Sequence, residues 1–303
     1  MTDKLVLGID VSKAWLDIAV NGHVERIANE EAAITAFLDR LGVPRIAVVA
    51  FEPTGGYERA LIVAAAESAA PLRRVHPNAL VAFRAACRLT AKTDALDAQL
   101  IADYARAIPA VHGFEAPVDA VLRGLVVRRR QLLDMRHAER CRRDIAEPAL
   151  LASHDAVIAC LTDQAETIEK DIAERLKDHQ RLASTLIAVK GVAMLSAATF
   201  IAELPELGCR SAKTIAALVG LAPRTRQSGT LKRRATVGHG RRGVRMILFN
   251  ATRTAIRCNP VIKDFFQRLV ARGKPGRVAF TAAMRKLLVI LNAKTRDALA
   301  QPA

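Results

Sequence analysis

Short apolar runs separated by turns dominate the first 110 residues of the chain. Three of them have the length of strands and lie at Lys4–Asp10, Trp15–Val20 and His23–Ala28. The dipeptide Asn21-Gly22 between the second and third is typical of a tight hairpin turn. Two later runs, Ile46–Glu52 and Leu72–His76, again have strand length. The pattern predicts a three-strand meander followed by two more strands.

Segments with helical spacing fill the gaps between the later strands. We expect helices near Glu30–Leu41, from Gly56, from Asn78 and from about Thr93. A meander followed by alternating strands and helices is typical of an α/β fold of the ribonuclease-H-like (RuvC-like) kind. A doubly wound sheet lacks such an opening meander. We therefore predict a first domain of this fold over residues 1–112.

The texture changes between Pro117 and about Gln180. Apolar residues recur there at spacings of three and four, and no Phe, Tyr or Trp occurs from Glu115 through Thr199. Two thin helices that fold back at Pro148 would form an antiparallel hairpin, each helix up to about 45 Å long. We predict this helical hairpin, a coiled-coil arm, over residues 113–185. We expect it to join subunits into a homo-oligomer, a dimer with a tetramer in the active complex.

The third predicted domain covers residues 186–303 and is mainly α-helical. A Gly turn at Gly191 followed by a helix over Ala193–Glu203 indicates a helix-hairpin-helix, an element that presents backbone N–H groups to phosphate. An apolar segment follows at Thr214–Leu221, and an amphipathic helix is expected at Val244–Arg257. The stretch between these two is basic and rich in Gly, and we expect it to be a loop.

Positive charge is concentrated in this third region. The whole chain carries a formal charge of +16, but residues 208–303 hold 21 Lys and Arg against only Asp264 and Asp297, a local +19. The remaining 207 residues hold 25 Lys and Arg against 28 Asp and Glu, a net −3. A solvated face explains a short charge run, but not a hundred residues almost without acids. The distribution predicts a nucleic acid as the partner. Our candidate nucleic-acid contacts are Lys13, Lys92, Arg224, Arg226, Lys232, Arg233, Arg234, Arg241, Arg242 and Arg245.

Other classes of protein receive no support. The N-terminus is polar rather than a signal peptide, and no apolar stretch has the length needed to span a bilayer. The five cysteines are scattered and form no Cys-x-x-Cys pair, so neither a zinc site nor a disulfide framework is indicated. We therefore expect no membrane partner and a location in a reducing cytoplasm.

Four acidic residues stand where chemistry is expected. Asp10 and Glu52 end apolar strands, and Asp94 and Asp97 lie three residues apart, on one face of a predicted helix. Carboxylates that converge on one cleft repel one another unless a cation lies between them. Oxygen ligands without thiolates suggest Mg²⁺ (or Mn²⁺) acting on a phosphodiester.

These acids have two other interpretations. They can be ordinary surface carboxylates at strand ends. The tripeptide Gly8-Ile9-Asp10 also opens sugar kinases and actin-like ATPases, but those need a Gly-rich or Thr-rich phosphate loop, and Val11-Ser12-Lys13-Ala14 has no Gly.

Several motifs together resemble a known family. They are Gly8-Ile-Asp-Val-Ser-Lys13, Glu52-Pro-Thr-Gly-Gly-Tyr57, Lys92-Thr-Asp-Ala-Leu-Asp-Ala98, Gly191, Gly220-Leu-Ala-Pro223 and Ser228-Gly229, in this order. The chain is similar, nearly end to end, to the DEDD transposases of insertion sequences. This is the bridge-RNA-guided serine recombinase family, which also includes pilin-gene invertases.

The resemblance implies a specific chemistry. It implies a RuvC-like domain that uses Asp10, Glu52, Asp94 and Asp97 on a divalent metal. It implies a C-terminal transposase domain whose nucleophile is Ser228, acting on double-stranded donor and target DNA. It also implies guidance by a non-coding RNA that the element itself encodes. With this resemblance we expect a bacterial, nucleoid-associated protein.

The residues alone leave the role of Ser228 open. A Ser-Gly pair in a basic loop is typical of a turn with a phosphate contact. Surrounding arginines and lysines would also stabilise a pentavalent phosphate, as a nucleophile requires. His239, between two glycines, is interpreted as a loop residue or phosphate contact, and Ser211 is the next serine on the N-terminal side. The alternatives are a metal-dependent, RuvC-like junction-resolving endonuclease and a non-enzymatic architectural binder, although the binder leaves the four acids unexplained.

Overall fold

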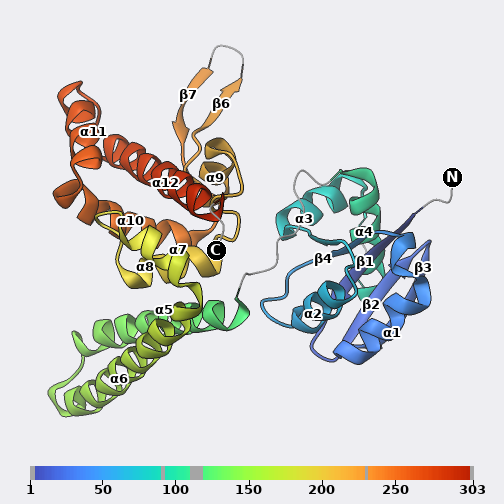
Figure 1. Ribbon diagram of the computed structural model, residues 1–303. Coiled ribbons are helices and arrows are strands. Elements are labelled where there is room, and N and C mark those ends of the chain that lie inside the picture. Colours follow the sequence, from blue (N-terminus) through green and yellow to red (C-terminus); the bar gives the residue numbers. More distant parts are fainter. Residues whose placement is uncertain (1–3, 90–92, 110–118, 229–230, 301–303) are drawn as a thin grey trace. The chain divides into compact units, whose positions relative to one another are not determined.

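The computed structural model describes residues 4–89, 93–109, 119–228 and 231–300. The chain forms two compact units, Met1–Ala116 and Pro117–Ala303 (Figure 1). Each unit has its own apolar core.

A five-stranded mixed sheet forms the centre of the first unit. In spatial order its strands are β3 (His23–Ala28), β2 (Trp15–Val20), β1 (Leu5–Val11), β4 (Ile46–Phe51) and β5 (Leu72–Arg74). β1 pairs with β2 antiparallel and with β4 parallel, so it lies at the middle of the sheet. The meander and the two following strands are confirmed, and β2 and β3 have the predicted bounds.

Helices cover both faces of this sheet (Figure 1). They are α1 (Glu31–Leu41), α2 (Arg59–Glu67), α3 (Pro77–Ala86) and α4 (Asp94–Ala107). Leu7 and Ile9 of β1 pack in one core with α1 and α2, whereas Val6 packs in another with α3 and α4. Because side chains alternate along a strand, Gly8 and Asp10 share the α4 face with Val6. The mixed sheet with its helices fits the predicted ribonuclease-H-like fold.

A long helical hairpin opens the second unit. It consists of α5 (Ala120–Arg143) and α6 (Leu151–Arg175), joined through a short 3-10 turn at Pro148–Leu150. At 1.5 Å per residue α5 is about 36 Å long, shorter than the expected 45 Å. Leu122, Val126 and Ile172 are buried against the rest of the unit, but no residue from 133 to 164 is buried. A separate arm domain and a coiled coil stay predictions.

The rest of the second unit is mainly helical. Its helices are α7 (Gln180–Ile187), α8 (Met194–Glu203), α9 (Ala212–Val219), α10 (Arg242–Cys258), α11 (Pro260–Ala271) and α12 (Gly276–Ala300). Gly191 lies in the turn between α7 and α8, as predicted; phosphate binding by this turn stays a prediction. The expected basic loop is instead in large part a β-hairpin, β6 (Arg224–Ser228) and β7 (Leu231–Thr236). Strand pairing there was not predicted because the segment has almost no apolar residues to alternate with the polar ones.

Candidate functional site

Small residues let α4 pack directly on the central strand, β1. A Cβ atom at Gly8 would lie 2.2 Å from the backbone nitrogen of Ala102 and 2.3 Å from the carbonyl oxygen of Ala98, closer than any side chain is found. Ala98 and Ala102 are completely or almost completely buried against Ala19 of β2. This close packing fixes the first turn of α4, which carries Asp94 and Asp97, relative to β1.

The predicted acids interact electrostatically where α4 packs on β1. Burial, as the largest cause, and then the charges of Asp97, Asp94, Asp17 and Glu52, in that order, together raise the pKa of Asp10 from 3.8 to about 6. The charges of the other three predicted acids therefore all act on the Asp10 carboxyl group. Glu52 follows β4 directly, beside the end of β1 in the parallel register.

Asp17 is a fifth acid, which the sequence analysis missed. It faces Asp10 directly across the antiparallel β1–β2 pair, and it is buried. Arg26 of β3 binds both Asp17 oxygens at 2.9 Å and reaches Asp94 at 3.2 Å. An acid in the otherwise apolar run Trp15–Val20 was the signal that could have revealed it.

Arginines hold two of the candidate metal ligands. Arg84 of α3 forms an ion pair with Asp97, and Arg26 forms one with Asp94. In the part of the chain that the structure describes, no three acidic, His or Cys side chains are arranged to hold a metal ion. The donors nonetheless fit a hard divalent cation, because they are all oxygen atoms and their mutual repulsion raises the pKa of Asp10. A cation that binds them would have to replace the two guanidinium groups.

Two loops next to the acids are tied together. The Asn29 side-chain amide donates to the Ser12 carbonyl at 2.8 Å and to the Tyr57 carbonyl at 2.9 Å, so it links the loop after β1 to the loop after β4. Glu58 accepts hydrogen bonds from the Thr54 hydroxyl and the Gly56 N–H. Burial raises the pKa of Glu58, but these bonds outweigh burial and lower it. The loop that begins at Glu52 is thus internally ordered.

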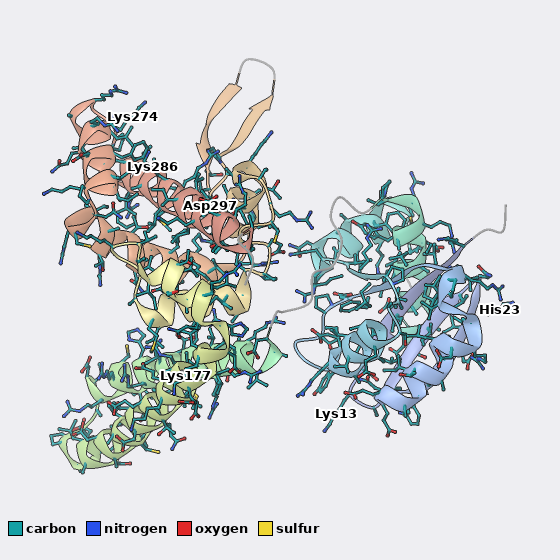
Figure 2. All side chains as sticks on the ribbon, in the orientation of Figure 1. Lys13, His23, Lys177, Lys274, Lys286 and Asp297 are labelled. Carbon is teal, nitrogen blue, oxygen red and sulfur yellow. The ribbon has the colours of Figure 1, made fainter. Side chains whose placement is uncertain are left out.

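The residues predicted to contact nucleic acid are distributed over both units. Lys13 is exposed in the bend after β1 (Figure 2), and Lys92 lies outside the described residues. Arg224, Arg226 and Ser228 belong to β6, and Lys232, Arg233 and Arg234 belong to β7; Ser228 pairs with Leu231. His239 is exposed and has a positive φ of 56°. Ser211 caps α9 by accepting from the Thr214 N–H, a structural role.

Two of the predicted cations are engaged within the protein. Arg241 forms a two-bond ion pair with Glu206 and donates to the Glu203 carbonyl oxygen at 2.9 Å. Arg245 donates to the Val219 carbonyl oxygen at 3.1 Å. These contacts anchor the start of α10, so a phosphate contact by either residue stays a prediction.

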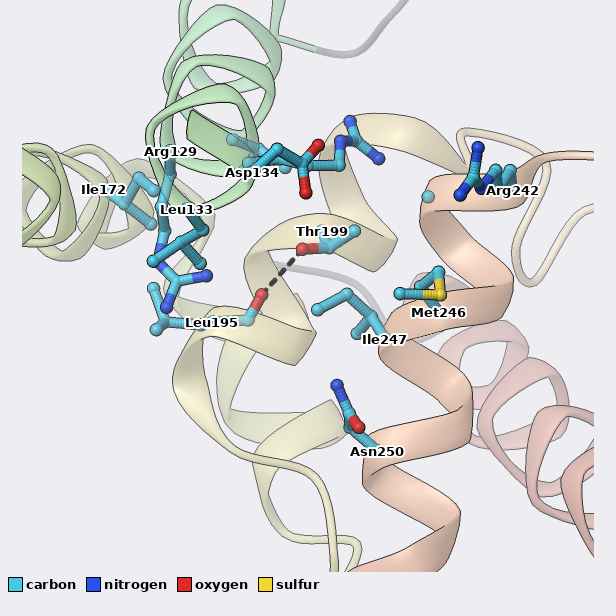
Figure 3. A pocket seen from close by; sticks show the side chains of 13 residues that line it. Arg129, Leu133, Asp134, Ile172, Leu195, Thr199, Arg242, Met246, Ile247 and Asn250 are labelled. Carbon is cyan, nitrogen blue, oxygen red and sulfur yellow. Dashed lines mark hydrogen bonds between the residues drawn. The ribbon is translucent and has the colours of Figure 1, made fainter. Parts of the chain in front are cut away.

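Arg242 stands at the edge of a pocket of about 440 Å³ (Figure 3). The pocket lies where α5 meets α8 and α10, and Leu133, Leu195 and Ile247 supply apolar walls. Thr199 also lines it, but its hydroxyl already donates to the Leu195 carbonyl oxygen at 2.8 Å. Arg242 is exposed, in contrast to the paired Arg241.

Two family models match the sequence. Residues 7–146 match a model described as Transposase, for the DEDD type of IS110 elements, and residues 183–267 match one described as Transposase IS116/IS110/IS902 family. The chain belongs to the IS110 family of transposases. It is therefore an enzyme that cuts and rejoins DNA.

Relatives of this family include two proteins named for DNA inversion. The pilin gene-inverting proteins of Moraxella lacunata and Moraxella bovis are each 27% identical over 258 residues, covering 81% of this chain and 79% of theirs. An insertion element IS110 protein of Streptomyces coelicolor is 28% identical over 156 residues, covering 51% of this chain and 37% of its own. In the described part of this transposase, no helix is both long and apolar enough to cross a bilayer.

Proposed function

We propose that this transposase cuts and rejoins DNA strands through a covalent serine–phosphate intermediate with the help of a divalent metal, Mg²⁺ or Mn²⁺. The observation that supports a role for a divalent metal is the accumulation of acidic charge around Asp10. Asp10, Glu52, Asp94 and Asp97 would hold the cation. When bound, it would stabilise negative charge on the phosphate oxygens.

The protein's own residues supply the remaining steps. The Ser228 hydroxyl attacks the scissile phosphorus, the bond to the departing strand oxygen breaks, and a serine phosphodiester forms. The serine proton passes to a base, and a second DNA end later displaces the serine oxygen. Arg224, Arg226, Lys232, Arg233 and Arg234 on the same β-hairpin supply the positive charge that this pentavalent phosphate requires.

The acids and the serine belong to different compact units of the chain. We propose that the active centre is composite and forms only in the assembled complex. That complex would hold donor and target DNA, a non-coding guide RNA from the element and several copies of this chain, a dimer or tetramer joined by the helical hairpin. Its place of action would be the nucleoid in the bacterial cytoplasm.

A covalent adduct tests the serine step. The parent protein, Ser228→Ala and the control Ser153→Ala are incubated with Mg²⁺, end-labelled DNA that flanks the coding region and RNA transcribed from it. Ser153 is an exposed serine on α6, far along the chain from the proposed chemistry. On a denaturing gel the parent and the control should form a protein–DNA adduct, and Ser228→Ala should form none. An adduct in Ser228→Ala would move the nucleophile to another residue, with Ser211 tested first.

A second candidate is a metal-dependent, junction-resolving nuclease in which Ser228 only binds DNA. The nuclease-like sheet with its acids favours this alternative. It requires Mg²⁺-dependent cleavage without an adduct, and both reactions should be lost in the double variant Asp10→Asn/Asp94→Asn. Full activity in that double variant would remove the metal site from either scheme.

A further inference from the structure

The exposed face of α10 combines positive charge with groups on which bases stack. Arg242, Met246, Phe249, Asn250, Arg253 and Arg257 are all exposed. At 100° per residue they fall within an arc of about 100°, and they extend for about 22 Å along the helix. The opposite face carries buried residues, among them Leu248 and Ala255. We call these six exposed residues the α10 stripe.

An aromatic pair lies at the middle of the α10 stripe. Phe249 is 45% exposed, and its ring packs on Phe280 of α12 with 4.8 Å between the ring centroids and 48° between the planes. Arg277, Phe280 and Met284 of α12 line the same open pocket as Phe249. An exposed ring held by a second ring offers one fixed, free face for stacking.

Positive charge surrounds this ring. Arg253 is one helical turn from Phe249, and Arg277 is three residues before Phe280; both are exposed. No acidic residue lines the pocket at Phe249. Lys274 lies just before α12, whereas Lys286 of α12 places its ammonium group over the Phe265 ring, 4.9 Å from the ring centroid (Figure 2). At the other end of the α10 stripe, Asp134 of α5 lies in the pocket that Arg242 borders (Figure 3).

We infer that the α10 stripe binds an unpaired nucleic-acid strand, with a base stacked on Phe249 and phosphates on Arg253 and Arg277. Arginines alone would hold any phosphate backbone, duplex or single strand. A stacking ring serves only bases that are not already stacked inside a duplex, because it needs their π-face. Met246, one turn from Phe249 toward Arg242, and Asn250, the residue after Phe249, continue the stripe with a polarizable side chain and a group that can hydrogen-bond a base edge. The inference refines the proposed function by naming single-stranded DNA or RNA as a bound species.

Fluorescence anisotropy on the full-length protein tests this. The probes are a labelled 20-nucleotide single-stranded DNA of mixed sequence, an RNA of the same sequence and the DNA duplex, all measured in EDTA at fixed salt. Phe249→Leu keeps an apolar contact with Phe280 but removes the ring, and Phe249→Tyr keeps the ring. We expect Phe249→Leu to weaken single-strand binding about tenfold and duplex binding less than twofold. Phe249→Tyr should restore parental affinity.

The salt dependence separates the two kinds of contact. Phe249→Leu should leave the slope of log K against log salt unchanged, whereas Arg253→Gln should weaken all probes and reduce the slope by just under one. Val261→Ala, at an exposed apolar residue of α11, is the control and should bind like the parent. Preference for the RNA or the DNA strand identifies the natural source of the unpaired bases.

Two outcomes would overturn the inference. One is parental single-strand affinity in Phe249→Leu. The other is an equal loss for strand and duplex at an unchanged melting temperature, which would make Phe249 a general contact. Because the assay contains no metal, it is independent of strand cleavage. A protein that binds single strands through Phe249 but never joins DNA ends would contradict only the proposed function.

Discussion

Gly8 of β1 touches the backbone of Ala102 in α4 so closely that no Cβ atom fits between them. The contact sets the height of α4 above the sheet, and the first turn of that helix carries Asp94 and Asp97 toward Asp10. The packing of two small residues thus positions the acids of the candidate site.

Gly8→Ala should lower the free energy of unfolding of the first unit by about 2–3 kcal/mol, because α4 must move to admit a methyl group. The control is Gly124→Ala in α5, where nothing lies within 4 Å of the added Cβ. That substitution should stabilise the protein by about 0.5–1 kcal/mol, because alanine favours a helix over glycine. Urea unfolding followed by circular dichroism measures both changes. Unchanged stability in Gly8→Ala would contradict the close contact.

Asp10→Asn should stabilise the metal-free protein. The folded pKa of Asp10 is about 6 against 3.8 when unfolded, so the folded state binds more protons between these values. Stability therefore falls as the pH rises from about 4 to 6, and the loss persists at pH 7. Asparagine removes that loss, by about 1 kcal/mol after solvent screening. Thermal melts in EDTA from pH 4 to 8 should show a flatter profile for the variant, and an identical profile would rule out the shifted carboxyl.

Arg84→Gln should increase the response of the protein to Mg²⁺. Without this guanidinium the charge on Asp97 is no longer balanced, so the metal-free protein melts at a lower temperature and regains more on adding Mg²⁺. Arg40→Gln breaks the exposed pair with Glu25 on α1 and β3 and serves as the control. It should show the parental Mg²⁺ response. Equal responses in the two variants would mean that Asp97 does not bind the metal.

Some features of this site could be predicted from the sequence, and others could not. The strands and the four acids were predicted because apolar runs and turn residues such as Asn21-Gly22 are local signals. Arg84 and Arg26 were not predicted as partners, because they meet Asp97 and Asp94 across 13 and 68 residues of chain and no local pattern records such contacts. The β6–β7 hairpin was missed because its pairing rests on backbone hydrogen bonds among polar residues.

Asp119 should make the second unit sensitive to acid. Burial alone would raise its pKa, but hydrogen bonds from the Leu122 N–H, His179 and Arg175 outweigh burial and lower it to about 2. Its stabilising effect is complete above pH 4 and is lost as the pH falls from about 4 to 2. Asp119→Asn still caps α5 but lacks the charge, so it should cost about 1–2 kcal/mol at pH 7. Denaturant melts at pH 7 and pH 2.5 should show the gap closing; a gap that persists at pH 2.5 would assign the loss to packing.

Ile145→Glu/Leu150→Glu should dissociate the proposed oligomer. These residues lie at the tip of the hairpin, where Ile145 is 87% exposed and Leu150 53% exposed. If the hairpin joins subunits, such apolar groups are covered in the assembly, and two carboxylates there oppose it. Light scattering after size exclusion should give the monomer mass for the variant, while Ile145→Val/Leu150→Met keeps the parental mass. A monomeric parent would contradict subunit joining by the hairpin.

The helix that presents Phe249 also contributes Val244, Leu248 and Ala251 to the core of its unit. A ligand on one side of such a helix is coupled to folding, because whatever binds only the folded form adds its binding energy to stability. Binding of a strand to α10 and folding of the C-terminal unit are then thermodynamically coupled. A strand bound along α10 therefore raises the melting temperature of the C-terminal unit. The bound protein resists heat and proteolysis better than the free protein.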